Sequence, residues 1–406
     1  MGRILLASTR SGGLFLLLAC GLAWGCDSGG EEIAADPTAS LSGIVRDAYT
    51  EAPLAGIELR ISGREITSGA DGSYAFEGID VGWVTLEATA PRYASYSQLL
   101  SLQAGSNSHN VSLDPQTLYH VEVNSLEGFT LYLPPGAASF RGILFVVAGA
   151  GGESRAFVRG QFEADPSIAA FQEEMYQNFL ALAERYDLAI LGEDSRGFDH
   201  SRRTGERAAE AISQLAVDTG YPELAAAPLL FWGYSAGGCF SYSVAQEFPE
   251  RVIGFVTQKG GCHSEGDHGP GKLVPGYLFI GEGDTFARIE NISEAFGINR
   301  AAGALWALGL DPGAGHEPVE VGGAADVVDR WMDVVLTQRL PATPGAELQS
   351  IAEGSGWLGD NTTFGIGSFE CFTGDRSAAS WLPTRETAED WQSLSSDGRV
   401  TSVMSC

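Results

Sequence analysis

Short apolar runs alternate with segments of helical periodicity between residues 117 and 340, and this alternation constrains the fold more than any other feature. Each run is continuously apolar, which is typical of strands buried on both faces of a sheet. The runs fall at residues 143–147, 188–191, 228–232, 252–256, 277–280 and 304–308. Helical spacing between them is clearest at Phe171, Met175, Phe179, Leu182 and Tyr186. The pattern predicts an α/β fold, in which helices cover both faces of a mostly parallel sheet.

Residues 40–115 follow a different pattern, in which apolar and polar residues alternate within short strands. Such strands fall at 41–46, 57–61 and 83–88, and an Asp-Gly turn at 71–72 precedes another one. Together they predict a small all-β sandwich ahead of the α/β body.

The motifs at residues 43–47, 53–56, 71–76 and 90–93 resemble those of the carboxypeptidase regulatory-like, transthyretin-like family. Arg92 stands where that family usually has glycine. The resemblance implies a seven-strand sandwich without catalysis of its own. We expect a spacer, and contact with a glycan or a partner is the alternative.

Length and charge exclude several classes of protein. The 406 residues suffice for two or three domains, and 44% hydrophobic with 19% charged residues is ordinary globular composition. The net charge is −28, and Lys259 and Lys272 are the only lysines. Such a chain repels polyanions, so we expect no nucleic acid partner.

Residues 1–26 are typical of a removable export signal. Two arginines precede an apolar run at 14–24 that is short for a bilayer span of roughly 20 residues. Small residues before Cys26, or alternatively before Cys20, resemble a bacterial lipoprotein box, and Cys26 leaves the fuller apolar stretch. We therefore expect a cell-envelope lipoprotein that meets the membrane only through a lipid anchor, with residues 27–39 as a polar tether. Plain secretion, with both cysteines removed, is the alternative.

The motif Gly-Tyr-Ser-Ala-Gly at residues 233–237 follows one buried run directly and leads into a helix-compatible segment at 240–248. A serine in a tight turn between strand and helix needs small residues two positions away on each side. Because the chain has 53 glycines, such a motif can occur by chance, so on its own it is weak evidence for a nucleophile. The strand before it and the helix after it support the prediction. Ser235 is the candidate nucleophile.

An acid and a histidine follow Ser235 in the chain. Asp284 lies just after the run at 277–280, with Glu282 close enough to replace it, and His316 lies in a glycine-rich loop after the run at 304–308. Carboxyl ends of parallel strands meet at one edge of a sheet, which is where such sheets collect their catalytic groups.

With these residues, the segment 117–340 resembles an alpha/beta-hydrolase, nearest in style to secreted esterases of the polyhydroxybutyrate-depolymerase and feruloyl-esterase kind. The resemblance implies Ser235 as nucleophile, His316 as general base and acid, and Asp284 as the group that orients the histidine. It also implies an oxyanion hole formed by the backbone N–H groups of Ala236 and Ala150, and no cofactor. Many relatives have His-Gly where this chain has Ala148 and Gly149.

The other histidines are expected to be surface or loop residues. His263 and His268 lie near Glu265 and Asp267, but their spacing matches no metal motif, so we expect no metal site.

The roughly 20 residues between the runs at 252–256 and 277–280 lack a long amphipathic insertion that would form a lid. An open site favours a bulky or polymer-attached ester, and the negative charge disfavours anionic substrates.

Residues 341–406 follow a proline-marked break and are rich in aromatic residues, which predicts an extension packed on the hydrolase. An aromatic platform for sugars is the alternative.

In an exported protein, four mature cysteines are expected to pair. Position along the sheet favours Cys239 with Cys262, and a shared segment favours Cys371 with Cys406. Four free thiols are the alternative.

The sequence thus predicts an exported serine esterase that cleaves carboxylic esters through an acyl-enzyme. Two alternatives stay open. A serine peptidase would use the same three residues, and a surface-binding lipoprotein would use the sandwich while the hydrolase body serves as scaffold.

Overall fold

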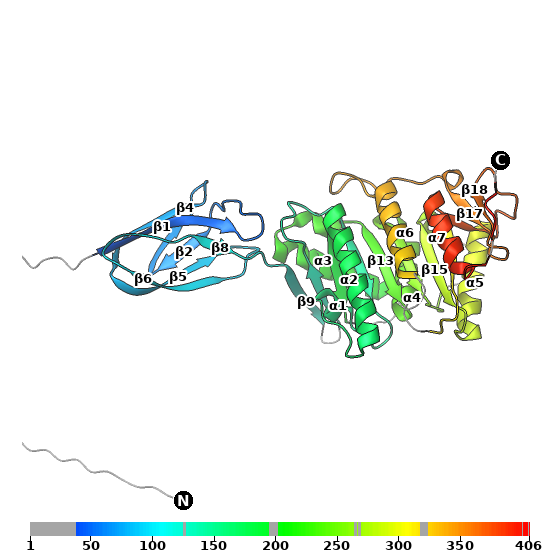
Figure 1. The fold of residues 1–406 in the computed structure, drawn as a ribbon, viewed down its shortest axis with the longest axis horizontal. Coiled ribbons are helices and arrows are strands. Elements are labelled where there is room, and N and C mark those ends of the chain that lie inside the picture. The colour runs from blue at the N-terminus through cyan, green and yellow to red at the C-terminus, as the bar shows by residue number, and fades with distance from the viewer. Residues whose placement is uncertain are drawn as a thin grey trace, which may run out of the picture.

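The computed structural model describes residues 38–124, 127–194, 202–263, 266, 269–316, 324–399, 401–404 and 406. Figure 1 shows a β-sandwich at one end, an α/β body in the middle, and a C-terminal extension at the other end. The predicted export signal, with Cys20 and Cys26, lies outside the described residues. Within those residues, no helix combines the length and apolar character needed to cross a bilayer.

Two four-stranded sheets form the sandwich. One contains β1 (Thr38–Asp47), β4 (Ser73–Asp80), β7 (Gly105–Ser108) and β8 (Val111–Leu113). The other contains β2 (Glu58–Ile61), β3 (Arg64–Thr67), β5 (Gly82–Thr89) and β6 (Tyr96–Leu102). Alternate residues point inward, as the sequence pattern predicts, and form one apolar core that includes Leu41, Leu59, Phe76 and Leu86.

The sandwich has eight strands rather than seven because the strand beside β1 is interrupted. Both β7 and β8 pair with β1 in parallel. Between them the Ile44 N–H donates to the side-chain oxygen of Asn110 at 3.0 Å. A Cβ at Gly43 would lie only 1.7 Å from the carbonyl oxygen of His109.

Arg92 has a φ of +70°, a conformation that favours glycine, which accounts for the glycine usual at this position.

The body is built on an eight-stranded sheet in the order β16-β15-β14-β13-β11-β12-β10-β9. Its strands are β9 (Leu118–Asn124), β10 (Glu127–Tyr132), β11 (Gly142–Val147), β12 (Leu188–Glu193), β13 (Leu229–Tyr234), β14 (Val252–Gln258), β15 (Gly276–Gly281) and β16 (Trp306–Asp311). The β9–β10 and β10–β12 pairs are antiparallel, and the other pairs are parallel. The mostly parallel sheet is therefore confirmed, although β16 begins two residues later than expected.

Helices cover both faces of this sheet (Figure 1). On one face lie α3 (Arg202–Thr219), α4 (Ala236–Glu247) and α5 (Phe286–Ala301), over a core that includes Phe145, Phe231 and Phe240. On the other lie α1 (Ser154–Val158), α2 (Pro166–Tyr186), α6 (Ala324–Arg339) and α7 (Arg385–Ser395), over a core that includes Phe179, Trp232 and Trp331. The α/β class and the preceding all-β sandwich are as predicted.

The C-terminal extension packs against the β16 edge of the body. It forms a small antiparallel sheet of β17 (Trp357–Gly359), β18 (Ile366–Ser368) and β19 (Ser380–Leu382), followed by α7. The Trp391 indole N–H donates to the carbonyl oxygen of Leu308 in β16 at 2.6 Å. Trp381 and Trp391 are fully buried, so neither side chain serves as an exposed platform.

Disulfides join Cys239 to Cys262 and Cys371 to Cys406, which is the predicted pairing. The first bond ties α4 to the loop after β14. The second closes a loop of the C-terminal extension.

A half-buried carboxyl on α6, that of Asp329, faces α2. Burial raises the pKa of Asp329 to about 7, and the negative charges of Asp326, Glu174 and Asp333 add to the effect. Asp329 shares a small cavity with Gln258, whose buried amide has no hydrogen-bond partner among the described residues. Folding therefore favours the protonated form of Asp329.

Asp329→Asn should stabilise the fold more at pH 8 than at pH 5. The folded pKa is about 7 and the unfolded value is near 3.8, so the folded state binds the extra proton across this interval. The free energy of unfolding consequently falls as pH rises through it, and asparagine removes that loss. Urea titrations at both pH values measure the effect, with exposed Asp218→Asn as control. An equal effect of Asp329→Asn at the two pH values would contradict it.

Candidate active site

Ser235 occupies a strained turn between β13 and α4. Its φ of +51° and ψ of −118° lie in a region that L-residues rarely adopt. Both neighbours two positions away must be glycine. A Cβ at Gly233 would lie 2.2 Å from the carbonyl oxygen of Gly237, and a Cβ at Gly237 would lie 2.2 Å from that of Val147. The close packing of β11, β13 and α4 thus explains the spacing of the motif.

The three residues predicted from the sequence lie together at the carboxyl edge of the sheet. His316 Nε2 is 3.0 Å from the Ser235 hydroxyl oxygen, and His316 Nδ1 is 3.1 Å from Asp284 Oδ2. The Asp284 side chain is 1% exposed and that of His316 is 35% exposed. A nucleophile, a base and an orienting carboxylate in this order can perform acyl transfer.

Glu282, the alternative acid, has a different contact. Its carboxylate accepts a hydrogen bond from the Gly313 N–H at 2.9 Å, in the loop that leads to His316. It holds this loop, while Asp284 contacts the imidazole itself.

The environment of Asp284 keeps its carboxylate ionised. Burial by itself raises the pKa of Asp284, but hydrogen bonds from the Thr285 N–H, from His316 and from Arg288 outweigh burial and lower it. Arg288 Nη1 lies 2.5 Å from Asp284 Oδ1, so the two carboxylate oxygens have separate partners. The sequence analysis missed Arg288. It lies on α5, four residues after Asp284, and this spacing could have indicated an ion pair.

Tyr234 holds the loop that carries the histidine. Its hydroxyl donates to the His316 carbonyl oxygen at 2.7 Å, and the two rings lie 5.4 Å apart at 32°. The residue directly before Ser235 therefore helps to hold the loop that carries His316. Nothing in the sequence pattern indicated this contact.

A buried ion pair joins the strand ends beneath these groups. Lys259 Nζ lies 2.9 Å from Asp311 Oδ2, and both side chains are fully buried. Lys259 follows β14, whose Gln258 carbonyl accepts from the Ser235 N–H at 2.8 Å. Asp311 ends β16, and its carbonyl accepts from the Glu282 N–H at 3.1 Å. The pair thus spans β15 from the nucleophile side to the acid and histidine side, and the sequence analysis missed it.

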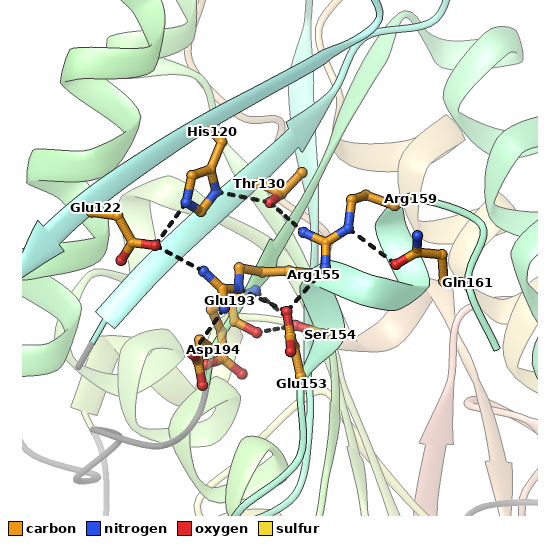
Figure 2. A network of polar contacts seen from close by, with 10 residues as sticks. All are labelled: His120, Glu122, Thr130, Glu153, Ser154, Arg155, Arg159, Gln161, Glu193 and Asp194. Carbon is orange, nitrogen blue, oxygen red and sulfur yellow. Dashed lines mark hydrogen bonds and ion pairs between the residues drawn. The ribbon is translucent and has the colours of Figure 1, made fainter. Parts of the chain in front are cut away.

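The loop at residues 148–153, which contains Ala150, is fixed by the end of β12 (Figure 2). A Glu193 carboxylate oxygen accepts from the Ala148 N–H at 3.3 Å. The Ser154 hydroxyl donates to the Glu193 carbonyl at 3.0 Å and accepts from the Glu193 N–H at 2.7 Å. A Cβ at Gly149 would lie 3.2 Å from Ser235 Cβ, so the loop runs close to the nucleophile.

Arg155 reinforces the far end of this loop. Its guanidinium lies 2.9 Å from the Asp194 carboxylate, 3.0 Å from that of Glu153 and 3.2 Å from that of Glu122. Arg155 and Asp194 are buried. Figure 2 shows that these charges converge from β9, β12 and the start of α1. The loop is consequently anchored at both ends.

His263 lies in a loop, which is one of the two places expected for the remaining histidines. Its side chain is buried, with Nε2 3.2 Å from the Thr257 hydroxyl and its ring 4.3 Å from that of Tyr242. Glu265, Asp267 and His268, the other members of the weighed cluster, lie outside the described residues. In the part of the chain that is described, no group of three His, Cys, Asp or Glu side chains suits a metal ion.

An apolar pocket of about 270 Å³ adjoins the loop at Gly149 and Ala150. Its walls come from Phe157, Ile168, Phe171, Met175, Trp232 and Tyr234. Glu153 and Glu163 add negative charge to the lining. The pocket suits an uncharged, apolar group.

Known proteins resemble parts of this chain. Residues 40–114 match the family model of the carboxypeptidase regulatory-like domain, as predicted for this segment. A ferulic acid esterase is 10% identical with a TM-score of 0.39, covering 54% of this chain and 96% of that one. An alpha/beta hydrolase enzyme from a Medee basin deep-sea metagenome library is 18% identical with a TM-score of 0.38, covering 54% and 98%. A thermostable esterase is 9% identical with a TM-score of 0.35, covering 68% and 91%.

No curated protein matches the chain. The strand order, the turn at Ser235 and the succession of serine, aspartate and histidine after β13, β15 and β16 nevertheless define the fold of the body. It is an alpha/beta-hydrolase fold, preceded by a carboxypeptidase regulatory-like domain.

Asp311→Asn should destabilise the protein by about 3 to 5 kcal/mol, because it leaves the buried Lys259 ammonium without its carboxylate. The double variant Lys259→Met with Asp311→Leu should cost much less, since it removes both charges and fills similar volume. Urea unfolding followed by tryptophan fluorescence gives the two free energies. A double variant as unstable as Asp311→Asn would show that the ion pair does not carry this energy.

Proposed function

We propose that this protein is an exported serine hydrolase that cleaves carboxylic esters. The observation that carries the proposal is the hydrogen-bonded chain from Asp284 through His316 to Ser235, at a strained turn between strand and helix. Such a chain activates an otherwise weak hydroxyl nucleophile.

The reaction proceeds in two halves. As the Ser235 oxygen attacks the ester carbonyl carbon, His316 Nε2 takes the hydroxyl proton, and the carbonyl oxygen becomes an oxyanion. The intermediate then collapses, the alcohol leaves with the proton from His316, and an acyl-enzyme stays on Ser235. Water, deprotonated by His316, attacks this acyl group, and the acid is released. Asp284 stays ionised and stabilises the imidazolium in both halves.

Two backbone amides are proposed to bind the oxyanion. The Ala236 N–H belongs to the first residue of α4, where helical N–H groups have no intrahelical acceptor and the helix dipole favours negative charge. The Ala150 N–H lies on the anchored loop beside Ser235. Pre-aimed donors of this kind stabilise the transition state by a few kcal/mol each.

The pocket and the net charge point to a neutral ester with an apolar group. Most of the side chains that line the pocket are apolar, while two glutamates and a net charge of −28 oppose anionic groups. Among the residues described between β14 and β15, the short 3-10 helix Gly269–Leu273 is the only helix, so this part of the chain shows no helical lid. This arrangement favours a bulky or polymer-attached ester.

Export is proposed on two grounds. The disulfides Cys239–Cys262 and Cys371–Cys406 suit an oxidising compartment. The lipoprotein-like signal would add a lipid at Cys26, or at Cys20, and the sandwich would then act as a spacer between membrane and enzyme.

Ser235→Ala should lower kcat for p-nitrophenyl butyrate by at least about 10³-fold, because no acyl-enzyme can form. Ser213→Ala, an exposed serine on α3, is the control and should leave kcat unchanged. Chromogenic peptides serve as a second substrate class. Residual turnover by Ser235→Ala near the wild-type rate would contradict the mechanism, and faster cleavage of the peptides would make the protein a peptidase.

Glu193→Leu should lower kcat about tenfold with little change in KM, since it frees the Ala148 N–H and loosens the oxyanion loop. Glu193→Gln keeps an acceptor for that N–H and should retain most of the activity. Steady-state kinetics on the same ester separate the two parameters. A loss of equal size in both variants would show that Glu193 does not act by positioning this loop.

A further inference from the structure

The outer face of the β2-β3-β5-β6 sheet carries an exposed tryptophan. Trp83 on β5 is 72% exposed, and Leu99 on β6 is 56% exposed. The register pairs Trp83 with Ser101 and Thr85 with Leu99, so Trp83 and Leu99 are diagonal neighbours on one face. Trp83 does not belong to the core on the other face of this sheet, so its indole face is available to a ligand.

Polar groups in fixed positions surround this indole. Arg60 lies 2.5 Å from the Glu58 carboxylate and 3.1 Å from that of Glu65, and in the register it stands opposite Glu87. The Arg60 guanidinium is therefore held in place before any ligand arrives.

The same residues line a shallow hollow of about 600 Å³. We define the Trp83 platform as six residues of this hollow that carry an aromatic, charged or hydroxyl group: Arg60, Ser62, Glu65, Trp83, Thr85 and Glu87.

We infer that the Trp83 platform binds an uncharged polysaccharide. The face of a pyranose ring presents C–H groups, which pack against the negative face of an indole. The hydroxyl groups around the ring rim then meet guanidinium donors, carboxylate acceptors and the Thr85 hydroxyl at the edge of the platform. This inference is independent of the proposed hydrolase activity.

Charge and apolar area favour a sugar over the other classes of occupant. The platform and the adjoining Glu58 bring three glutamates together around one arginine, Arg60, so this face repels anionic polymers while its carboxylates can bind the hydroxyl groups of an uncharged one. A protein interface needs a larger apolar centre than Trp83 with Leu99. An anionic membrane would be repelled by these glutamates and by the net charge of −28.

The test is retention of the full-length protein on insoluble polysaccharides. Microcrystalline cellulose, insoluble xylan and starch granules are each incubated with wild type and with Trp83→Ala, and the free protein is measured across a concentration series. We expect retention by at least one polymer, weakened at least tenfold in Trp83→Ala and largely kept in Trp83→Phe. Tyr49→Ala, which removes an aromatic ring that is 60% exposed in the same domain but outside the platform, should bind like wild type.

Four outcomes would overturn the inference. These are no retention on any of the three polymers, equal retention of wild type and Trp83→Ala, binding to phosphatidylglycerol vesicles that is lost in Trp83→Ala, and dimerisation that is lost in Trp83→Ala. Hydrolysis of soluble p-nitrophenyl butyrate is measured in parallel and should be equal in all four proteins. It reports on Ser235 alone, so failure of the platform and failure of the proposed hydrolase are distinguishable.

Discussion

The close approach of β11, β13 and the start of α4 is the constraint on which the rest of the site depends. Gly233 and Gly237 have no room for a Cβ, and this close packing encloses the turn in which Ser235 has a positive φ. A backbone conformation this rare costs free energy, and it persists only where the surrounding structure fixes it. The turn places the Ser235 hydroxyl at the edge of the sheet where the neighbouring loops converge.

The loops at that edge are held by contacts that involve no reacting group. Tyr234 binds the carbonyl of His316, Glu282 binds the same loop at Gly313, and Arg288 occupies the second oxygen of Asp284. Below them, the Lys259–Asp311 pair ties the strand ends together in a region without water contact. A histidine loop rich in glycine would otherwise have many conformations, and these contacts select one of them.

Sequence patterns predicted the parts of this structure that depend on local periodicity or chain order. Buried strands such as β13 and β15 read as continuous apolar runs, and the order of Ser235, Asp284 and His316 follows from the strands that precede them. The Cys239–Cys262 pairing followed from the same placement, and the Cys371–Cys406 pairing followed from a shared C-terminal segment. The split between β7 and β8 was not predicted, because it depends on the close approach of Gly43 to the backbone of His109, far along the chain, where a Cβ would lie 1.7 Å from the His109 carbonyl oxygen. The buried Lys259–Asp311 ion pair was not predicted either, because a charged residue beside an apolar run is typical of a strand end at the surface.

Acyl-enzyme trapping tests the central claim most directly. The protein is mixed with a slowly deacylating p-nitrophenyl ester, quenched in acid, digested and mapped by mass spectrometry, while the release of p-nitrophenol is followed in parallel. The structure predicts a burst of about one p-nitrophenol per chain and an acyl group on the peptide that contains Ser235. Steady hydrolysis without a burst, or an acyl group on any other residue, would contradict it.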